Sequence, residues 1–370
     1  MEKIKIGTVF SGIGSIEQSL KLLQIPHEIS FACDNGNIQL EKIATQEELK
    51  KIETIKNKKN KLNFVENIYK NSKKTNFVKQ SYLANYDLPE ENFYHDVRFL
   101  GSHINKKIDI LVGGSPCQSF SVAGKRGGFE DTRGTLFFEF ARCIKEFQPK
   151  VFIYENVKGL LNHNQGKTLE VIKNTFTDLG YKYYCQLLNS KDYNIPQNRQ
   201  RIFIVGFKNH NSNFSFPEKQ ELEYYMGDFL IDNTDAPKKQ STPPNFFNSQ
   251  HTDLTSKKHN YFLSTQIIKT IMATSKGDNQ KINPTINTKI AKTLVASMHK
   301  MHRANVDNYV TVNGKLRKLM PRECLRLMGF PDTFKQVVSN TQMYQQAGNS
   351  IVVNVMSEIL KEIIKTINSK

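Results

Sequence analysis

The chain has 370 residues, of which 38% are hydrophobic, and carries a formal net charge of +17. This length is enough for one large or two modest domains, and no apolar run approaches the ~20 residues that span a membrane. The first ten residues contain no signal-peptide stretch, so we expect a cytoplasmic protein without a membrane partner. So positive a charge favours an anionic partner, nucleic acid above all, although a lysine-rich and asparagine-rich coding bias would produce the same composition.

The cysteines exclude two classes of small structural scaffold. Their number, five, is odd, and no two of them have the Cys-x-x-Cys spacing. We therefore expect neither a disulfide framework nor a cysteine-based zinc site. Cys143 and Cys185 lie within apolar segments and are interpreted as core residues, whereas the surroundings of Cys117 are different.

Strands and helices alternate along the first 206 residues. Helical apolar spacing occurs at residues 135–147 and 167–180, between segments that are typical of strands. The expected strands are Lys3–Phe10, His27–Asp34, Lys107–Gly114, Lys150–Val157, Tyr181–Asn189 and Arg201–Phe207. This alternation predicts an α/β fold with a doubly wound, Rossmann-like sheet.

Two segments depart from the alternation. Residues 38–92 are rich in Lys and Asn, with the sparse apolar spacing of surface helices, and are interpreted as a basic insertion. The insertion is either decoration or an additional surface for DNA. After Phe207 the sequence becomes polar and proline-containing, which predicts a smaller, loop-rich domain. We therefore expect a catalytic domain of residues 1–206 and 339–370 and a second domain of residues 207–338.

A nucleotide-binding pattern follows the first two strands. The turn "FSGIG", residues 10–14, opens a helix, and Asp34 ends the next strand. Glycines in this place let the backbone approach a nucleotide, and the acid accepts hydrogen bonds from ribose hydroxyls. Glu17 replaces the last glycine of the dinucleotide motif, which disfavours a pyrophosphate and favours S-adenosylmethionine. A purely structural glycine turn explains the motif equally well.

A second acid, Asp96 in "FYHDVRFL", follows in the same region. At the edge of the next strand it would meet the amino group of an adenine. A surface aspartate is the alternative interpretation.

A reactive thiol is expected at Cys117. It follows the apolar run "IDILVGG" and precedes a glycine-rich loop that carries Lys125, Arg126 and Arg133. Because the thiolate is the reactive form, a nucleophilic cysteine needs such an electropositive, accessible setting. The sequence therefore predicts a nucleophile at the edge of the sheet, under a cationic loop.

Two further strands place polar groups at the same edge. Glu155 follows the buried run "VFIY", and Gln197, Arg199 and Arg201 alternate, so that one strand would project all three to one face. A thiol, a carboxyl and a guanidinium together suit covalent addition to carbon 6 of a pyrimidine, with transfer of a methyl group to carbon 5.

With these motifs in order, the chain resembles the cytosine-5 DNA methyltransferases of bacterial restriction–modification systems. The matching motifs include "FSGIG", "HDV", "GGSPCQSFS", "ENV", "QNRQRIFIVG", "RKLMPRECLRLMGFPD" and "QQAGNS", and they extend from Phe10 to Ser350. The resemblance implies methyl transfer from S-adenosylmethionine to a cytosine flipped out of a specific duplex sequence, through a covalent adduct. It also implies that residues 207–338 are the target recognition domain.

The resemblance assigns roles residue by residue. Cys117 would be the nucleophile, Glu155 would hold ring nitrogen 3, Arg201 would hold the base oxygen, and Arg199 would support it. The implied cofactor contacts are Phe10, Ser11, Gly12, Gly14, Asp34, Asp96, Val97, Pro116, Leu136, Asn349 and Ser350. The expected DNA contacts are Ser121, Lys125, Arg126, Arg133 and Arg303. The family usually has Glu at position 34, so the shorter Asp34 is expected to make a looser or water-mediated contact.

The resemblance also bears on partners. We expect a monomer that binds double-stranded DNA, associates with the nucleoid through it, requires no metal and serves beside a cognate restriction endonuclease. Three alternatives remain at this point: an RNA cytosine-5 methyltransferase of similar core, a catalytically silent DNA-binding regulator, and a nicotinamide-dependent oxidoreductase. The last rests on the glycine turn alone.

Overall fold

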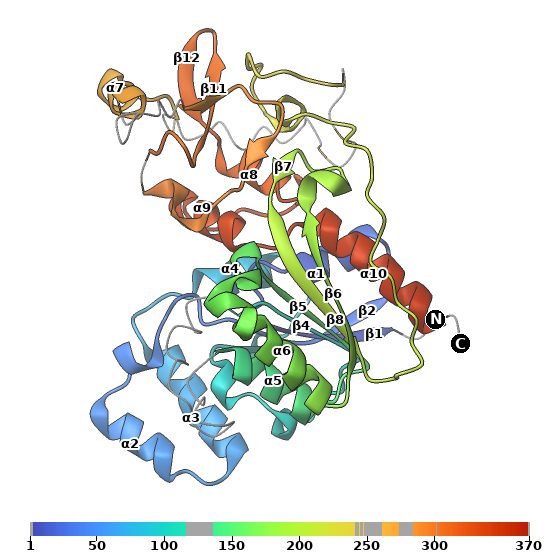
Figure 1. Ribbon diagram of the computed structural model, residues 1–370. Helices are drawn as coiled ribbons and strands as arrows, with labels where there is room; N and C mark the ends of the chain where they lie inside the picture. Colours follow the sequence, from blue (N-terminus) through green and yellow to red (C-terminus); the bar gives the residue numbers. More distant parts are fainter. Residues whose placement is uncertain are drawn as a thin grey trace. The chain divides into compact units, whose positions relative to one another are not determined.

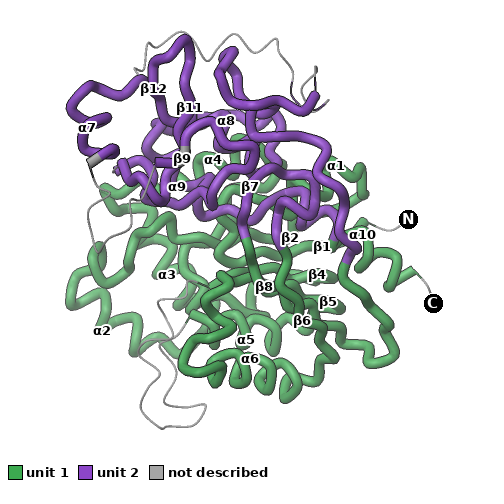
Figure 2. The backbone as a smooth tube through the Cα atoms, turned by 45° about the horizontal axis from the view of Figure 1, so that its top comes forward, with its two compact units in different colours: residues 1–188, 200–216, 359–370 green, residues 189–199, 217–358 purple. Residues whose placement is uncertain are grey.

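The computed structural model describes residues 3–115, 136–240, 244, 247, 261–273, 284–300 and 302–368 (Figure 1). By packing, the chain divides into two compact units (Figure 2). Unit 1 comprises residues 1–188, 200–216 and 359–370, and unit 2 comprises residues 189–199 and 217–358. Residues 339–358, which we expected in the catalytic domain, thus pack with unit 2, and residues 207–216 pack with unit 1.

A seven-stranded sheet forms the centre of unit 1, in the order β3-β2-β1-β4-β5-β8-β6. Its first five strands are mutually parallel, and β8 is antiparallel to β5. The strands are β1 (Ile4–Val9), β2 (His27–Cys33), β3 (Phe93–Tyr94), β4 (Ile110–Gly113), β5 (Val151–Val157), β6 (Lys182–Asn189) and β8 (Gln200–Phe207). The six strands expected from the sequence are confirmed, and the two-residue β3 is an addition.

Helices cover both faces of this sheet, which explains the continuous apolar runs of its central strands. Helix α1 (Ser15–Leu22) and the last part of α10 (Val353–Asn368) lie on one face (Figures 1 and 2). Helices α5 (Leu136–Phe147) and α6 (Lys167–Asp178) lie on the other, where aromatic rings interlock; the ring centroids of Phe152 and Phe176 are 4.3 Å apart. The doubly wound, Rossmann-like fold is therefore confirmed.

The insertion is helical, as its spacing predicted. It contains α2 (Gln46–Thr54), α3 (Lys58–Asn71) and α4 (Phe77–Asn85). A capping box starts α2: Thr45 Oγ1 accepts from the amide of Glu48, whose carboxylate accepts from the amide of Thr45. Buried apolar residues of α2 and α3 form a small core together with residues that follow β2.

Unit 2 contains short elements, as its composition predicted. Strands β7 (Gln197–Asn198) and β10 (Ala291–Lys292) form one sheet, and β9 (Thr285–Ile286), β11 (Asn308–Val312) and β12 (Lys315–Lys318) form another. The helices are α7 (Thr265–Ala273), α8 (Pro321–Arg326) and α9 (Asn340–Asn349). Asn313 and Gly314, both with positive φ, make the two-residue turn between β11 and β12, because this hairpin requires left-handed residues.

A buried ion pair stabilises unit 2. The Arg317 guanidinium donates to both carboxylate oxygens of Glu323 at 2.8 and 2.7 Å, and neither side chain is exposed. Glu323 also accepts from the amide of Met320, at the start of α8. The charged groups thus have their partners inside the unit, which burial of charge requires.

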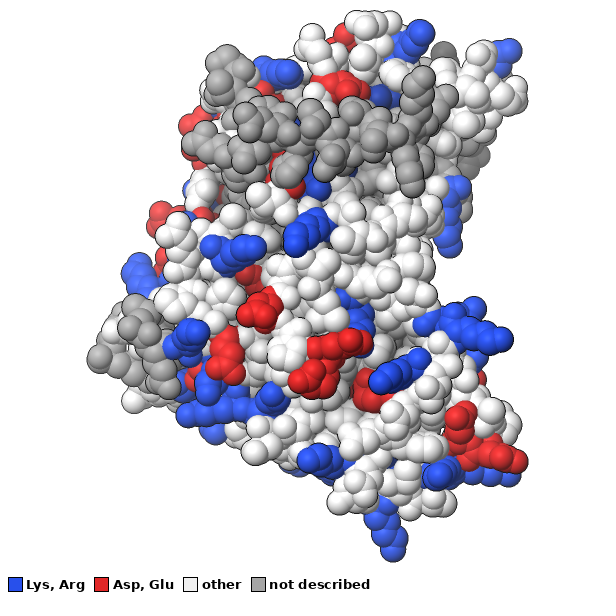
Figure 3. Space-filling model, turned by 180° about the vertical axis from the view of Figure 1, so that it is seen from behind, with Lys and Arg blue, Asp and Glu red and all other residues white. Residues whose placement is uncertain are grey.

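Charge is mixed over the surface. On the face drawn in Figure 3, Lys and Arg side chains are spread widely, with Asp and Glu among them.

Among the helices in the described ranges, none combines the length and the apolar content that a membrane crossing requires.

Candidate active site

Among the residues that the structure describes, eight of the expected cofactor residues belong to unit 1, most of them where strands end. Phe10 and Ser11 follow β1, Asp34 follows β2, and Asp96 comes two residues after β3. Because these parallel strands are neighbours in the sheet, their carboxyl ends bring the residues to one edge.

The turn after β1 has an unusual backbone. Phe10 (φ 54°), Gly12 (φ 53°) and Gly14 (φ 79°) all adopt left-handed conformations. Ser11 attaches this turn to the end of β2: its amide donates to the carbonyl of Cys33 at 3.1 Å, and its hydroxyl accepts from the amide of Cys33 at 2.8 Å. This conformation is unfavourable for Phe10 but not for the glycines, and at Phe10 it persists because the surroundings determine it, so the turn is preorganised.

The carboxylate of Asp34 joins the two turns. Its Oδ2 accepts from the amide of Gly12 at 2.9 Å, and its Oδ1 accepts from the amide of Gly36 at 2.8 Å. Burial raises the pKa of Asp34, and these two amide hydrogen bonds oppose the rise. The side chain is therefore held in one orientation at the edge where a ribose would lie.

Asp96 is held by a partner that the sequence analysis missed. It is 6% exposed, and Arg98 donates to it through Nε, at 2.9 Å to Oδ1, and through Nη2, at 2.6 Å to Oδ2. The hydroxyl of Tyr69 lies 3.4 Å from Oδ2. The segment "HDVR" could have predicted this pair, because Asp96 caps a short helical turn and such an acid lies beside the side chain two residues later, here Arg98. Val97, next to Asp96, is buried.

These residues fit S-adenosylmethionine better than a dinucleotide. Glu17, in the first turn of α1, is completely buried and occupies the position where a pyrophosphate-binding turn has its last glycine. An acid there opposes an anionic ligand but tolerates a cationic one. Phe10 and Leu136 supply half-buried apolar surface.

Within the described ranges, no cluster of three His, Cys, Asp or Glu side chains is arranged to hold a metal ion.

The expected base-binding pair forms within unit 1. In the β5–β8 ladder Glu155 is opposite Phe203 and Val157 is opposite Arg201, so Glu155 and Arg201 are diagonal neighbours on one face. Arg201 Nε lies 3.0 Å from Glu155 Oε1, and the two side chains are 17% and 14% exposed. The sequence prediction that these groups meet at the end of β5 agrees with this geometry.

Gly114, which directly follows the neighbouring strand β4, borders this pair. A Cβ there would lie 3.0 Å from both the carbonyl oxygen and Oε2 of Glu155, which is tighter than ordinary packing. Glycine at position 114 therefore lets the segment after β4 pass directly beside the carboxylate. Cys117 is three residues further along the chain.

A buried network that the sequence analysis missed holds the same segment. Asn156 Nδ2 donates to the carbonyl of Ser115 at 3.0 Å and to Tyr154 Oη at 2.9 Å, and the hydroxyls of Ser115 and Tyr154 are 2.8 Å apart. A buried amide at the end of an apolar strand was the available signal. The network orients the chain two residues before Cys117.

Several predicted residues lie outside the described residues. They are Pro116, Cys117, Ser121, Lys125, Arg126 and Arg133. Their roles stay predictions.

Other predicted residues belong to unit 2. Arg199 is buried and donates to the carbonyls of Leu294, Gly348 and Ser350, at 2.7, 3.0 and 2.8 Å. The single strand expected through residues 197–201 is divided, because β7 ends at Asn198 and β8 begins at Gln200. The expectation of one common face for Gln197, Arg199 and Arg201 is therefore wrong.

The remaining expected residues of unit 2 are Asn349, Ser350 and Arg303. Asn349 is exposed at the end of α9, and Ser350 is buried. The guanidinium of Arg303, the expected DNA contact, pairs with Asp307 at 3.1 Å. Their roles as cofactor and DNA contacts stay predictions.

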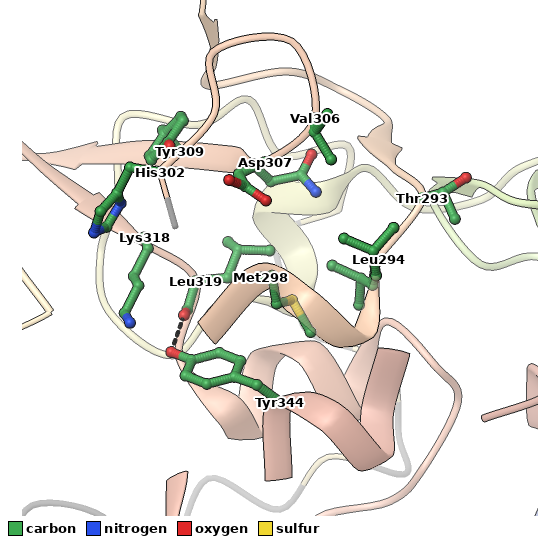
Figure 4. A pocket seen from close by; sticks show the side chains of 12 residues that line it. Thr293, Leu294, Met298, His302, Val306, Asp307, Tyr309, Lys318, Leu319 and Tyr344 are labelled. Atoms are coloured by element: carbon green, nitrogen blue, oxygen red, sulfur yellow. Dashed lines mark hydrogen bonds between the residues drawn. The ribbon is translucent and has the colours of Figure 1, made fainter. Parts of the chain in front are cut away.

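A small pocket of unit 2 lies beside Arg303. Leu294, Met298, His302, Tyr309, Lys318 and Tyr344 are among the side chains that line it (Figure 4). Burial, and secondarily the charge of Lys318, lower the pKa of His302. A volume of about 20 Å³ accommodates about one water molecule, so the pocket is too small for a base.

A doubly wound sheet with acids at the carboxyl ends of its second and third strands and no phosphate-binding glycine motif is the arrangement that we expect of a methyltransferase that depends on S-adenosylmethionine. The paired carboxylate of Glu155 and guanidinium of Arg201 lie beside the segment that follows β4. A family model, C-5 cytosine-specific DNA methylase, matches residues 4–365, and the chain belongs to this family. It is a DNA cytosine-5 methyltransferase of the restriction–modification type.

Individual relatives agree with this assignment. The chain is 40% identical over 269 residues to the type II methyltransferase M.HhaI of Haemophilus parahaemolyticus, covering 71% of this chain and 77% of that protein. It is 36% identical over 318 residues to M.SsoII of Shigella sonnei, covering 82% and 75%. The crystal structure of the Schizosaccharomyces pombe (S. pombe) Dnmt2 methyltransferase has the same fold, with a TM-score of 0.64 at 16% identity over 99% of this chain and 100% of that one.

Proposed function

We propose that this methyltransferase acts on a cytosine flipped out of a specific duplex DNA sequence, with Cys117 as its covalent nucleophile. The observation that carries the proposal is the partly buried Glu155–Arg201 pair, which borders the segment that leads to Cys117. A base stacked in a duplex cannot reach such an enclosed pair, so the nucleotide has to leave the helix.

Cys117, Glu155 and Arg201 each have a separate role in the proposed reaction. The Cys117 thiolate forms a bond to carbon 6, and the π electrons of the 5,6 double bond move to carbon 5. Glu155 holds ring nitrogen 3 and the exocyclic amine, and Arg201 donates to the base oxygen, so that both stabilise the charge that develops on the ring. S-adenosylmethionine, when bound, supplies the methyl group. The proton on carbon 5 then passes to water, and the bond from sulfur to carbon 6 breaks, which restores the aromatic ring and the thiolate.

The orientation of Glu155 supports its proposed role. Arg201 pairs with one carboxylate oxygen, Oε1, and the other, Oε2, lies close to the backbone of Gly114 after β4. A carboxyl that is paired through one oxygen and has little space beside the other presents its polar edge in one direction, as recognition of the nitrogen edge of a cytosine requires.

The cofactor is proposed to bind at the carboxyl ends of β1, β2 and β3. Asp34 would accept from the ribose hydroxyls and Asp96 would face the adenine amine, with Phe10 and Leu136 against the ring. Asn349, Ser350 and Pro116 are proposed as further cofactor contacts. Ser11, Gly12, Gly14 and Val97 would contact the cofactor through their backbone.

Unit 2 is proposed to read the DNA sequence. Its residues 217–338 would form the target recognition domain, with Arg303 among the DNA contacts. Ser121, Lys125, Arg126 and Arg133 would contact the duplex from the loop after Cys117. We propose a monomer, with a cognate restriction endonuclease as its functional counterpart.

Sequencing DNA from cells that express the chain tests this function. After bisulfite treatment we expect 5-methylcytosine at one recurring sequence with the wild-type chain and none with Cys117→Ala, which should still retard duplex DNA on gels. Duplex that carries 5-fluorocytosine at the mapped position should form an adduct, because fluorine blocks the elimination step. Methylation by Cys117→Ala, or an adduct at another residue, contradicts the proposal. Label transfer to tRNA alone would instead indicate an RNA methyltransferase.

A further inference from the structure

The start of α4 contacts the turn after β2. Asn76 is the N-cap of this helix, with its Oδ1 accepting from the amide of Lys79 at 2.9 Å. Its Nδ2 donates to the carbonyl of Asp34 at 2.7 Å. A Cβ at Gly36 would overlap the Asn76 side chain, so the turn that carries the ribose acid lies directly against the helix.

The end of α4 contacts the turn after β1. Tyr86 directly follows the helix, and its hydroxyl lies 2.7 Å from the carbonyl oxygen of Gly14 and 3.0 Å from that of Ile13, so that one proton is shared between two acceptors. The Gly14 carbonyl also accepts from the amide of Gln18, at the start of α1. A Cβ at Gly14 would overlap the Tyr86 ring.

A third contact lies on the same side of the helix. The Tyr82 hydroxyl donates to Glu17 Oε1 at 2.5 Å, and both side chains are completely buried. Tyr82 and Tyr86 are four residues apart, which places them on one side of a helix, and their ring centroids are 4.9 Å apart. The two ends of α4 therefore contact the two turns that are proposed to hold the cofactor, and Tyr82 contacts the first turn of α1.

We infer that Asn76, Tyr82 and Tyr86 are positioning residues, which hold the two cofactor turns in their binding conformation and thereby set the affinity for S-adenosylmethionine. The reason is energetic: the left-handed conformation is unfavourable for Phe10, and Gly12 and Gly14, which have many accessible conformations, lose entropy when they are held in one, so the turn needs external support. The buried polar contacts of Tyr82 and Tyr86 and the partly buried contact of Asn76 supply it. This inference rests on the proposed cofactor site, and it gives the last part of the insertion a role other than decoration or DNA contact.

Calorimetry with S-adenosylhomocysteine, the stable product, tests the inference. In Tyr86→Phe the ring stays and the hydroxyl is lost, so two buried carbonyls lose a donor. We expect the dissociation constant to rise about five- to tenfold, the KM for the cofactor to rise in parallel, and kcat at saturating cofactor to stay unchanged. Asn76→Asp keeps the capping oxygen but loses the donor to Asp34, and should weaken binding similarly if Tyr86→Phe fails to fold.

Tyr181→Phe is the matched control. Its hydroxyl also donates to a buried carbonyl, that of Pro149, at 2.7 Å, but on a part of unit 1 remote from both turns. We expect a comparable loss of thermal stability and an unchanged dissociation constant. Equal dissociation constants for wild type, Tyr86→Phe and Asn76→Asp overturn the inference, as does equal weakening by Tyr181→Phe. A wild-type chain that binds no S-adenosylhomocysteine refutes the proposed cofactor site itself, and the inference with it.

Discussion

The pKa of Glu17, a carboxyl close to the turn after β1, can be tested through the pH dependence of the free energy of unfolding. This carboxyl is completely buried in the first turn of α1, and its partner is the neutral hydroxyl of Tyr82. Burial raises the pKa of Glu17 from 4.5 to about 7, and the hydrogen bond from Tyr82 opposes the rise. Glu17→Gln keeps an acceptor for Tyr82 and removes the charge.

The sign and size of the effect follow from proton linkage. Below pH 4.5 the carboxyl is protonated in both the folded and the unfolded chain, and its charge costs nothing. Between pH 4.5 and 7 the unfolded chain loses the proton while the folded chain keeps it, so wild-type stability falls as the pH rises. Above pH 7 the full cost is present, about 3 kcal/mol for a shift of this size. Burial raises the pKa of Tyr82 and Tyr86 well above 10, so neither titrates in this window.

Urea unfolding of the cofactor-free chain at pH 5 and pH 8 measures the difference. We expect Glu17→Gln to gain about 2 to 3 kcal/mol over wild type between the lower and the higher pH. Glu170→Gln, at an exposed position of α6, is the control and should show no such gain. An equal difference between Glu17→Gln and wild type at both pH values would refute the assignment of a buried, late-titrating carboxyl.

Three further predictions concern the base site, unit 2 and the substrate. Gly114→Ala places a methyl group 3.0 Å from Glu155 Oε2, so kcat should fall on the order of a hundredfold while calorimetry finds unchanged cofactor affinity. Glu323→Gln removes the buried counter-charge of Arg317 and leaves it only the more exposed Asp232, so it should destabilise unit 2 by about 3 kcal/mol in urea unfolding; a change below about 1 kcal/mol contradicts the pairing. With a net charge of +17, DNA affinity in gel retardation should fall steeply between about 50 and 200 mM salt, and a flat response would argue against phosphate contacts.

Much of unit 1 could be predicted because its signals are local. An apolar run such as "DILVGG" indicates a buried strand, and the alternation of such runs with helical spacing indicates a doubly wound sheet. The meeting of Glu155 and Arg201 followed from one rule, that functional residues gather where strands end. Strands β3 and β7, of two residues each, escaped prediction because a segment this short has no periodicity. The interruption at Arg199 was missed for the same reason.

The amino-acid sequence by itself determined the motifs, the main strands and the family to which the chain belongs, because each depends on residues that are neighbours along the chain. The tertiary structure alone decided which buried groups support the site. Tyr82 and Glu17 are 65 residues apart, Asn76 and Asp34 are 42 apart, and Asn156 and Ser115 are 41 apart. No local pattern pairs such residues, since a hydrogen bond between them exists only after the sheet has brought their elements together.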